Sequence, residues 1–300
     1  MAIKLTFLGT SDQIPSKKRN HSAMLLTYNG ENILIDCGEG TQRQFKRAEL
    51  NMCKITRILI THWHGDHVFG IPGILSSLAL SGYNKKLYIY GPKGTKEFMN
   101  KLLDVFRFTK SYPIEVKEVS SGKFLDMKDF YIEAKAMAHG IPTNAYTFVK
   151  KGFTRIDKGK LKKSGLPEGP LLQNLKHGKD VKYNGKTYKA KDLTYKQDEL
   201  KVSIVLDTRF NSGIVPFVKG SNLLVSEATY SHELEKQAEE HLHLTSKQSA
   251  EIAKKAKVGR LVLTHLSQRY ENNPKHILDE AKKVFKNTVL AEDFSEFGIE

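Results

Sequence analysis

Hydrophobic residues along this chain gather in short runs separated by polar turns, a pattern that predicts buried strands. Segments with apolar positions at helical spacing follow several runs and predict helices. The expected strands cover residues 3–7, 22–28, 31–36, 55–60, 87–90, 114–119, 130–136, 202–206, 223–225 and 261–263. The expected helices cover residues 41–50, 69–81, 95–106, 246–257 and 274–286. The strands form two groups on either side of residues 152–196, each followed by helices, so we expect an α/β protein with two sheets between helical layers.

Local signals add detail to some of these elements. The apolar–polar alternation of residues 3–7 predicts a half-exposed strand. Asn29-Gly30 is a favoured turn pair and predicts a hairpin between the next two strands. Ser246 is the expected N-cap of the helix that follows it. The apolar face expected for the helix at 95–106 consists of Phe98, Leu102, Leu103 and Phe106.

Length and composition favour one globular domain over residues 1–300. The chain is 39% hydrophobic and 27% charged, which supplies a sizeable core. No apolar stretch approaches the roughly 18–20 residues that a membrane span needs, and the alternating N-terminus does not look like a signal peptide. Cys37 and Cys53 are too few for a disulfide framework and favour a reducing, cytoplasmic setting.

The net charge of +15 points to a polyanionic partner. Residues 152–196 hold twelve Lys or Arg and four Asp or Glu, a local charge of +8. This stretch is rich in Gly and Pro and poor in large aliphatic residues, so we expect a protruding basic arm that buries little core, with a disordered linker as the alternative. Lys17, Lys18 and Arg19 follow Pro15 in a loop that suits phosphate or a solvated turn equally.

Polar residues that can bind metal recur where the apolar strands end. They are His62, His64, Asp66 and His67 after residues 55–60, His139 after 130–136, Asp207 after 202–206, Glu227 after 223–225 and His265 after 261–263. Strand ends present loops to one edge of a sheet, where sites form. Imidazole nitrogen and carboxylate oxygen are the ligands that zinc-class ions prefer, so the pattern predicts a metal site.

Seven of these ligands suit two metal ions. The expected division is His62, His64 and His139 on one ion, Asp66, His67 and His265 on the other, and Asp207 as a bridge. Two ions about 3.5–4 Å apart can lower the pKa of a water between them and stabilise an in-line phosphoryl transition state. Asp66 could orient that water and accept its proton as the general base. The positive charge favours a phosphodiester over a lactam or a thioester as the substrate.

At these residues the chain resembles a known superfamily. His62-x-His64-x-Asp66-His67 is similar to the signature of the metallo-β-lactamase superfamily, and His139, Asp207 and His265 are similar to its later motifs. Other segments resemble the ribonuclease Z family, endonucleases that remove 3′ trailers from precursor tRNA. These segments are residues 7–10, 15–20, 36–42 and 226–229, and His265 with Ser267, Arg269 and Tyr270. The resemblance spans nearly the whole chain, although Ser226 stands where the family often has His.

The resemblance implies a four-layer αββα fold, a homodimer and two zinc ions, with manganese as an alternative. It implies that residues 152–196 form an exosite for the tRNA elbow and that the loop with Lys17, Lys18 and Arg19 contacts the acceptor stem. The exosite contacts would be Gly165, Pro167, Gly169, Pro170, Lys176 and Lys179. Glu227 and His243 would form a pair in which His243 protonates the departing 3′ oxygen, leaving a 3′-hydroxyl on the tRNA. A carboxylate beside an imidazole raises its pKa, which suits an acid.

Some alternatives stay open at this point. His241 and His232 compete with His243 for the acid role, although the spacing to Thr245-Ser246 favours His243. Another hydrolase of the superfamily, such as a lactamase, thioesterase or sulfatase, would have no evident use for the basic arm. A tRNA-binding protein with a degenerate site is the non-enzymatic alternative, and the intact ligand set argues against it.

Overall fold

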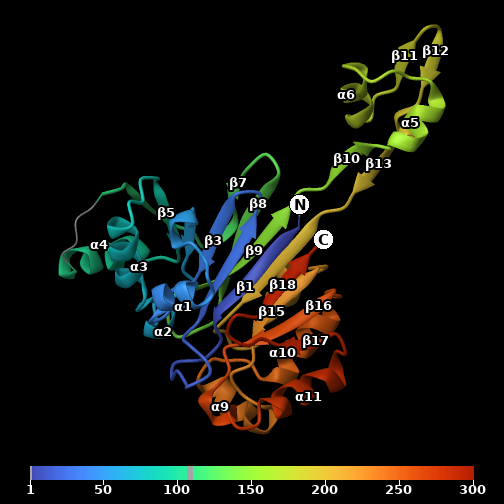
Figure 1. Ribbon diagram of the computed structural model, residues 1–300. Helices are drawn as coiled ribbons and strands as arrows, with labels where there is room; N and C mark the ends of the chain where they lie inside the picture. The colour runs from blue at the N-terminus through green and yellow to red at the C-terminus, as the bar shows by residue number, and fades with distance from the viewer. Residues whose placement is uncertain (1, 107–110) are drawn as a thin grey trace. The chain divides into compact units, whose positions relative to one another are not determined.

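The computed structural model describes residues 2–106 and 111–300 (Figure 1). The chain divides into two compact units. The first consists of Met1–Asp126, Ile132–Phe148 and Lys201–Glu300, and the second of Met127–Tyr131 and Val149–Leu200. Among the described residues, no helix is both long enough and apolar enough to cross a membrane.

The first sheet has the strand order β18-β1-β2-β3-β4-β5-β6 within the described part of the chain. Neighbours are antiparallel from β18 to β3 and parallel from β3 to β6. The strands are β1 (Ile3–Gly9), β2 (Ala23–Tyr28), β3 (Glu31–Ile35), β4 (Arg57–Leu59), β5 (Leu87–Gly91), β6 (Ile114–Glu118) and β18 (Glu296–Ile299). Asn29 and Gly30 have φ angles of 46° and 85° between β2 and β3, which confirms the expected hairpin.

The second sheet has the order β17-β16-β15-β14-β9-β8-β7 among the residues described. Its strands from β14 to β17 are parallel. The strands are β7 (Ser121–Asp126), β8 (Phe130–Met137), β9 (Thr143–Lys150), β14 (Leu200–Val205), β15 (Leu223–Glu227), β16 (Arg260–Thr264) and β17 (Thr288–Leu290). The expected division of strands at residues 152–196 is therefore wrong, because β7–β9 precede that stretch and β18 returns to the first sheet.

Helices cover the outer face of each sheet, which confirms two sheets between helical layers (Figure 1). The first sheet carries α1 (Thr41–Arg47), α2 (Gly65–Val68), α3 (Ile71–Leu80) and α4 (Thr95–Val105), with the 3₁₀ turn η1 (Met52–Lys54). The second carries α8 (Ile214–Val218), α9 (Glu235–Glu240), α10 (Ser246–Lys255) and α11 (Pro274–Val284), with η2 (His232–Leu234) and η3 (Gln268–Tyr270). Each helical layer closes its own apolar core, around Phe45 and Ile74 for the first sheet and Ala250 and Ile277 for the second.

The two sheets also pack face to face. The rings of Tyr28 and Phe148 meet edge to face at 5.5 Å between centroids. The buried hydroxyl of Tyr146 on β9 donates to the carbonyl of Ile60, 2.7 Å away. This bond satisfies a backbone group at the end of β4, one residue before the histidine-rich segment.

Three local expectations need correction. Strand β1 is buried rather than half-exposed, because β18 and β2 flank it and both its faces are covered. On α4, Leu102 and Leu103 pack against the core as expected, but the buried apolar residue is Met99, and Phe98 and Phe106 are 42% and 49% exposed. The N-cap of α10 is Thr245, whose side chain accepts from the N–H of Gln248 while the Gln248 side chain accepts from the N–H of Thr245.

The second unit contains all of residues 152–196 and has a small core of its own. Its elements are β10 (Phe153–Ile156), α5 (Lys158–Ser164), α6 (Leu171–Lys176), β11 (Val181–Tyr183), β12 (Lys186–Tyr188), α7 (Ala190–Leu193) and β13 (Thr194–Gln197). The buried residues that meet inside it are Leu161, Leu166, Leu175, Val181, Tyr188, Ala190 and Leu193. Regular structure around such a core is not what a disordered linker would show.

Candidate metal centre and active site

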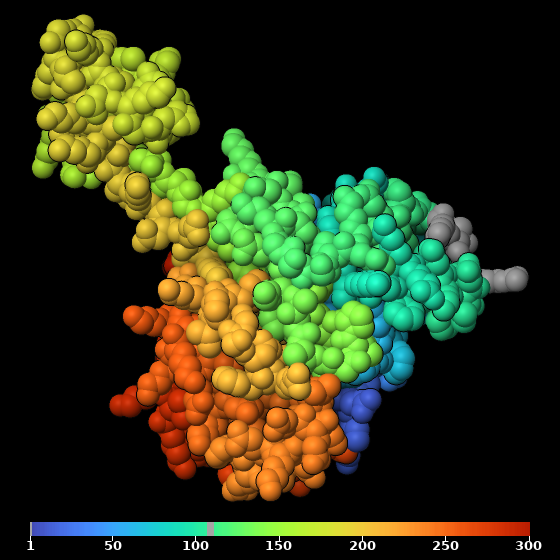
Figure 2. All heavy atoms as spheres, turned by 180° about the vertical axis from the view of Figure 1, so that it is seen from behind, coloured from blue at the N-terminus to red at the C-terminus, as the bar shows by residue number. Residues whose placement is uncertain are grey.

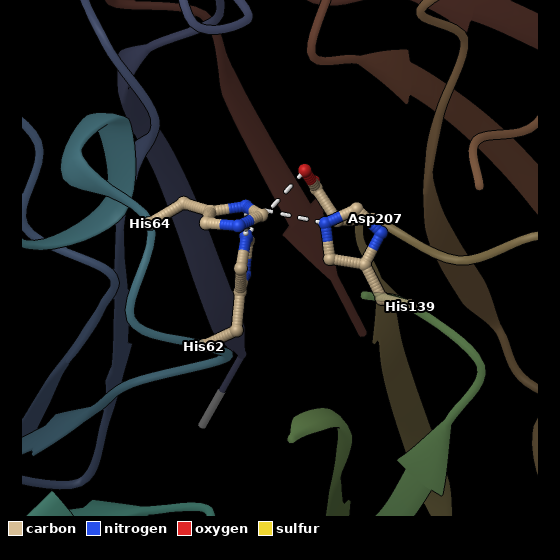
Figure 3. Close-up of side chains that lie close together, drawn as sticks. All are labelled: His62, His64, His139 and Asp207. Carbon is tan, nitrogen blue, oxygen red and sulfur yellow. Dashed lines mark hydrogen bonds and ion pairs between the residues drawn. The ribbon is translucent and has the colours of Figure 1, made fainter. Parts of the chain in front are cut away.

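The first donor group joins the segment after β4 to the ends of β8 and β14 (Figure 3). It consists of His62, His64, His139 and Asp207, whose ligand atoms all lie within 4.8 Å of one another. His64 Nδ1 lies 3.0 Å from His62 Nε2 and 3.2 Å from His139 Nε2. Asp207 Oδ2 lies 3.6 Å from His62 Nε2. Four ligand atoms from three separate segments thus converge on one point.

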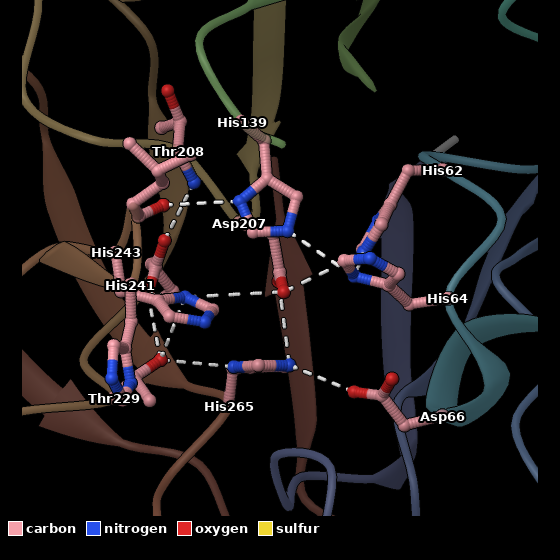
Figure 4. Close-up of polar contacts among 12 residues, drawn as sticks. His62, His64, Asp66, His139, Asp207, Thr208, Thr229, His241, His243 and His265 are labelled. Carbon is pink, nitrogen blue, oxygen red and sulfur yellow. Dashed lines mark hydrogen bonds and ion pairs between the residues drawn. The ribbon is translucent and has the colours of Figure 1, made fainter. Parts of the chain in front are cut away.

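The second donor group lies beside the first and shares Asp207 with it (Figure 4). Its other members are Asp66, His67 and His265. Asp66 Oδ2 lies 3.2 Å from His67 Nε2 and 3.3 Å from His265 Nε2. Asp207 faces this group with Oδ1, which is 3.5 Å from His67 Nε2 and 3.3 Å from His265 Nε2. The two oxygens of one carboxylate therefore face different groups.

Outer partners orient the imidazoles. Asp36 at the end of β3 accepts from the N–H and hydroxyl of Thr61, at 2.7 and 2.8 Å, and its Oδ2 lies 2.7 Å from His67 Nδ1. Thr229 Oγ1 lies 3.0 Å from His265 Nδ1, and the carbonyl of Leu242 lies 3.1 Å from the Nδ1 of the histidine at 139. Because the Nδ1 atoms of these three histidines are engaged, their Nε2 atoms face the centre, which is an arrangement of metal-binding histidines. His64 instead faces the centre with Nδ1.

Asp36 belongs to this network, although it was not among the strand-end residues expected at the site. It follows an apolar strand just as the ligands do, so the same signal could have found it. Asp36, Asp207 and His265 also share a left-handed backbone, with φ of 56°, 39° and 56°. Such backbone costs free energy in a non-glycine residue and persists where surrounding bonds enforce it, as at functional sites.

The residues present fit divalent metal ions. Asp207 Oδ1 is buried and has no hydrogen-bond donor of its own among the described residues. Burial, with the neighbouring His67, lowers the pKa of His62 well below its usual value and keeps that ring neutral. Burial alone would lower the pKa of His67 and His265, but the neighbouring carboxylates raise it, so without a cation these two rings hold protons that a bound metal would displace. Imidazole nitrogens and carboxylate oxygens that converge in a buried site are the ligands that a zinc-class cation prefers.

Glu227 and His243 form a close pair beside the two groups. His243 Nδ1 lies 2.9 Å from Glu227 Oε2, and the same carboxylate accepts from the backbone N–H of Thr208 and the hydroxyl of Thr229. Burial alone would lower the pKa of His243, but the charge and hydrogen bond of Glu227 raise it to about 9. Ser226 does not disturb the pair, because its hydroxyl donates to Ser249 instead.

The competing histidines have other partners. His241 Nδ1 lies 2.8 Å from the hydroxyl of Tyr230, and no described bond joins it to Glu227. His232 contacts Lys247 and Glu235. Of the three imidazoles, the one at 243 is placed against the carboxylate.

A cavity of about 320 Å³ opens onto both donor groups. Its lining includes residues that the sequence did not single out, namely Asp12, Gln13 and Tyr230, together with Thr229 from the segment 226–229. The expected members in the lining are His64, Asp66, His139, Asp207, His241, His243 and His265. Asp12 and Gln13 enter from the loop after β1, far from the metal-binding motifs in the chain, so no short-range pattern marks them.

The three cations of the loop after Pro15 have different surroundings. Lys17 and Lys18 are exposed, whereas Arg19 is only 7% exposed. Arg19 Nη1 donates to the hydroxyl of Thr10 and to the carbonyl of Ala291, at 2.8 and 2.6 Å. Its guanidinium therefore holds the loop in place, and only the two lysines offer charge to a ligand.

The residues expected in the exosite lie on the surface of the second unit. Gly165, Pro167, Gly169, Pro170, Lys176 and Lys179 are all exposed. Gly165 ends α5 with φ of 78°, a conformation that favours glycine. The glycine–proline segment is thus a turn between α5 and α6 that presents backbone rather than bulky side chains.

Known proteins resemble the chain over its whole length. Residues 3–139 match the family model described as anti-Pycsar protein Apyc1. The chain is 38% identical to ribonuclease Z of Bacillus cereus (strain AH187) and 40% identical to ribonuclease Z of Oceanobacillus iheyensis, over 99% of this chain and 100% of each relative. The crystal structure of the short form of human tRNase Z is 28% identical, with a TM-score of 0.71 and 99% of both chains covered. The metallo-β-lactamase fold protein YhfI from Bacillus subtilis, 19% identical with a TM-score of 0.73 over 100% of both chains, shows the same fold.

Proposed function

Because the chain belongs to the ribonuclease Z family, we propose that it cleaves the 3′ trailer from precursor tRNA and leaves a 3′-hydroxyl on the tRNA. Family membership makes the protein a metal-dependent tRNA-processing endonuclease, which is a hydrolase. The observation that carries the detailed proposal is the pair of donor groups joined through Asp207 beside Glu227 and His243.

We propose two zinc ions per chain, with manganese as the alternative. His62, His64 and His139 would hold one ion, Asp66, His67 and His265 the other, and Asp207 would contact both. When bound, such a pair of ions supplies Lewis-acid activation of a water and neutralises charge on the phosphoryl group. Asp66 and His243 would complete the chemistry from the wall of the cavity, and Glu227 is buried behind His243.

Asp66 would orient the attacking water and accept its proton. Although burial favours the protonated acid, the imidazoles of His67 and His265 hold the pKa of Asp66 well below its usual range. The carboxylate is therefore ionised at neutral pH and can orient a water by accepting its hydrogen bond. It also lines the cavity, where the scissile phosphate would bind.

His243 would act as the acid on the opposite side of the reaction. Its Nδ1 faces Glu227 at 2.9 Å, so its Nε2 carries the proton that can be donated. The departing group is the 3′ oxygen of the tRNA, which needs a proton to leave as a hydroxyl. Glu227 would act by orienting the imidazole and stabilising its charged form, because it is fully buried beneath the ring.

Binding of the tRNA would use two basic surfaces. Lys17 and Lys18 would contact the acceptor stem near the scissile bond, and the second unit would contact the elbow through its glycine–proline turn and its lysines. The net charge of +8 in residues 152–196 supports an electrostatic contact with phosphates. We further propose a homodimer in a reducing cytoplasm, where the free thiols of Cys37 and Cys53 are stable.

The proposal is tested by incubation with a precursor tRNA that carries a 3′ trailer, with and without a chelator. Metal-dependent cleavage close to the base that precedes the trailer is the expected result. No cleavage of any precursor tRNA by metal-replete protein would contradict the proposal.

A further inference from the structure

One face of the two-stranded ribbon formed by β10 and β13 exposes two aromatic rings beside an arginine. In the antiparallel register Arg155 lies opposite Tyr195, and Phe153 lies opposite Gln197. Because alternate residues of a strand share a face, Phe153, Arg155 and Tyr195 lie on the same side of the ribbon. Phe153 is 39% exposed and Tyr195 is 50% exposed, so neither ring belongs to the core of the second unit.

These three side chains line an open hollow of about 1040 Å³ within the second unit. Most of this unit is coloured lime to yellow in Figure 2. The hollow is large enough for a nucleotide and exceeds the cavity over the donor groups. Lys128, Lys158 and Lys176 lie around it. Two carboxylates, of Asp157 and Glu168, are also present, but Asp157 already accepts a hydrogen bond from the N–H of Lys160 at the start of α5. Positive charge therefore dominates the wall.

The rings of Phe153 and Tyr195 and the guanidinium of Arg155 offer flat surfaces on which a base can stack. The Arg155 guanidinium lies 4.7 Å from the centroid of the Phe153 ring, a cation–π distance that orders both side chains. Nucleobases stack on aromatic rings and on guanidinium planes. A hollow that combines such planes with surrounding lysines matches a base together with its phosphates. An acidic peptide would satisfy the lysines but would leave the two ring faces unmatched.

We propose that Phe153, Arg155 and Tyr195, here called the ring face, bind an unpaired nucleobase of the substrate RNA. The base must be unpaired because the faces of bases in a duplex are covered by their neighbours. The proposal rests on the proposed function, which supplies a precursor tRNA as the partner. It divides the contacts of the second unit into two kinds. The lysines contact phosphates, with affinity that falls as salt rises, and the ring face stacks on a base, with little dependence on salt.

The test compares three double variants in binding to precursor tRNA at salt concentrations from about 50 to 200 mM. Phe153→Leu with Tyr195→Leu removes both rings but keeps apolar side chains at exposed positions. Phe153→Tyr with Tyr195→Phe keeps both rings and is the matched control. Lys162→Gln with Lys163→Gln, at the exposed C-terminal end of α5, removes two charges outside the hollow. Thermal unfolding of each variant verifies that the fold is retained.

The leucine pair should weaken binding about tenfold at every salt concentration, because a stacked base contributes on the order of 1–3 kcal/mol. The slope of log affinity against log salt concentration should be the same as in the unchanged protein. The ring-keeping pair should bind within about twofold of the unchanged protein, and the glutamine pair should reduce the slope by about 1–2. Unchanged binding by the leucine pair, or an equal loss in the ring-keeping pair, would overturn the stacking site.

Failure of this inference is distinguishable from failure of the proposed function. If the unchanged protein cleaves precursor tRNA and the leucine pair binds it normally, only the ring face is refuted. If the unchanged protein cleaves no precursor tRNA, the proposed function fails, and a short single-stranded RNA and a fully paired hairpin then serve as probes. A preference for the single strand that disappears in the leucine pair supports the ring face, and equal binding of both probes overturns it.

Discussion

The carboxylate of Asp293 accepts a hydrogen bond of 2.9 Å from the backbone N–H of Asn20 and thereby ties the lysine loop to the C-terminal segment of the chain. The same carboxylate accepts from the hydroxyl of Thr10, at 2.8 Å, and from Gln44 Nε2, at 2.9 Å. Thr10 in turn accepts from Arg19. One side chain therefore holds both ends of the loop that presents Lys17 and Lys18, the cations proposed to contact the acceptor stem.

We expect Asp293→Asn to raise the KM for precursor tRNA by about tenfold and to change kcat by less than about twofold. An amide nitrogen cannot accept, so at least one donor loses its partner, and a hydrogen bond to a charged group contributes roughly 1.5–3 kcal/mol. Steady-state cleavage kinetics provide the measurement. Asp279→Asn is the matched control, because Asp279 lies on the surface of α11, where it pairs with Lys275.

A double-mutant cycle then shows whether Asp293 acts through the loop. In a background of Lys17→Ala with Lys18→Ala, the Asp293 substitution should add less than about twofold to KM, because the contacts that it positions are already gone. If the Asp293 substitution raises KM by the same factor with and without the two lysines, Asp293 contributes only to general stability. The metal content of the variant should stay unchanged, which separates a loosened loop from a damaged centre.

Substitution of Asp66 and removal of the arm should affect different steps. Asp66→Ala should lower kcat by at least about a hundredfold with tRNA affinity nearly kept, since a general base contributes about 10²–10⁴-fold. Deleting residues 154–196 should mainly weaken binding. Phe153 and Gln197 pair directly in the ribbon, so a short glycine linker can rejoin the chain there. Equal loss of affinity in both proteins would contradict this division, and a binding assay in chelator, where no cleavage occurs, measures it.

Protonation of the leaving group can be isolated with a modified substrate. His243→Ala should lower kcat about 10²–10⁴-fold on ordinary precursor tRNA, whereas His241→Ala should cost less than about tenfold, as that ring contacts Tyr230 rather than Glu227. A substrate with sulfur in place of the bridging 3′ oxygen has a thiol as its leaving group, and thiols ionise near pH 8.5. On this substrate the loss of kcat caused by His243→Ala should be much smaller than on ordinary precursor tRNA. An undiminished defect would place His243 in another role.

Metal content follows from the two donor groups. Elemental analysis should find about two zinc or manganese ions per chain, and about one after His139→Ala or His265→Ala, because each of these residues is proposed to hold one of the two ions. Asp207→Ala should reduce both. His232→Ala is the control, because that imidazole pairs with Lys247 and Glu235 outside the centre. Near-zero metal in the unchanged protein would instead favour a tRNA-binding protein with a degenerate site.

The gathering of the metal-binding residues could be expected from sequence because parallel strands deliver their carboxyl ends to one edge. His62, Asp207 and His265 each follow a short apolar strand, so a rule about strand ends is sufficient to group them. The pattern of apolar runs did not predict strand β9. It is buried along its whole length, but Asn144, Thr147 and Lys150 interrupt its apolar pattern and leave no clear period.

Other features depend on contacts that no local pattern records. Arg19 looks like a free cation beside two lysines, and only the fold brings it against Thr10 and Ala291. Tyr230 reaches the cavity wall because the segment after β15 turns back beneath the histidines at 241 and 243. The core of the second unit likewise gathers single aliphatic residues from helices and strands spread over residues 161–193, none of which forms an apolar run.

The central claim is that the centre joined by Asp207 releases a tRNA with a 3′-hydroxyl, and the most direct measurement determines both new ends after cleavage of a trailer-bearing precursor. Metal-replete protein should give one tRNA product with a free 3′-hydroxyl and a trailer with a 5′-phosphate, and both products should disappear with chelator or with Asp207→Ala. Products that carry a 3′-phosphate, or cleavage that persists without metal, would contradict the account.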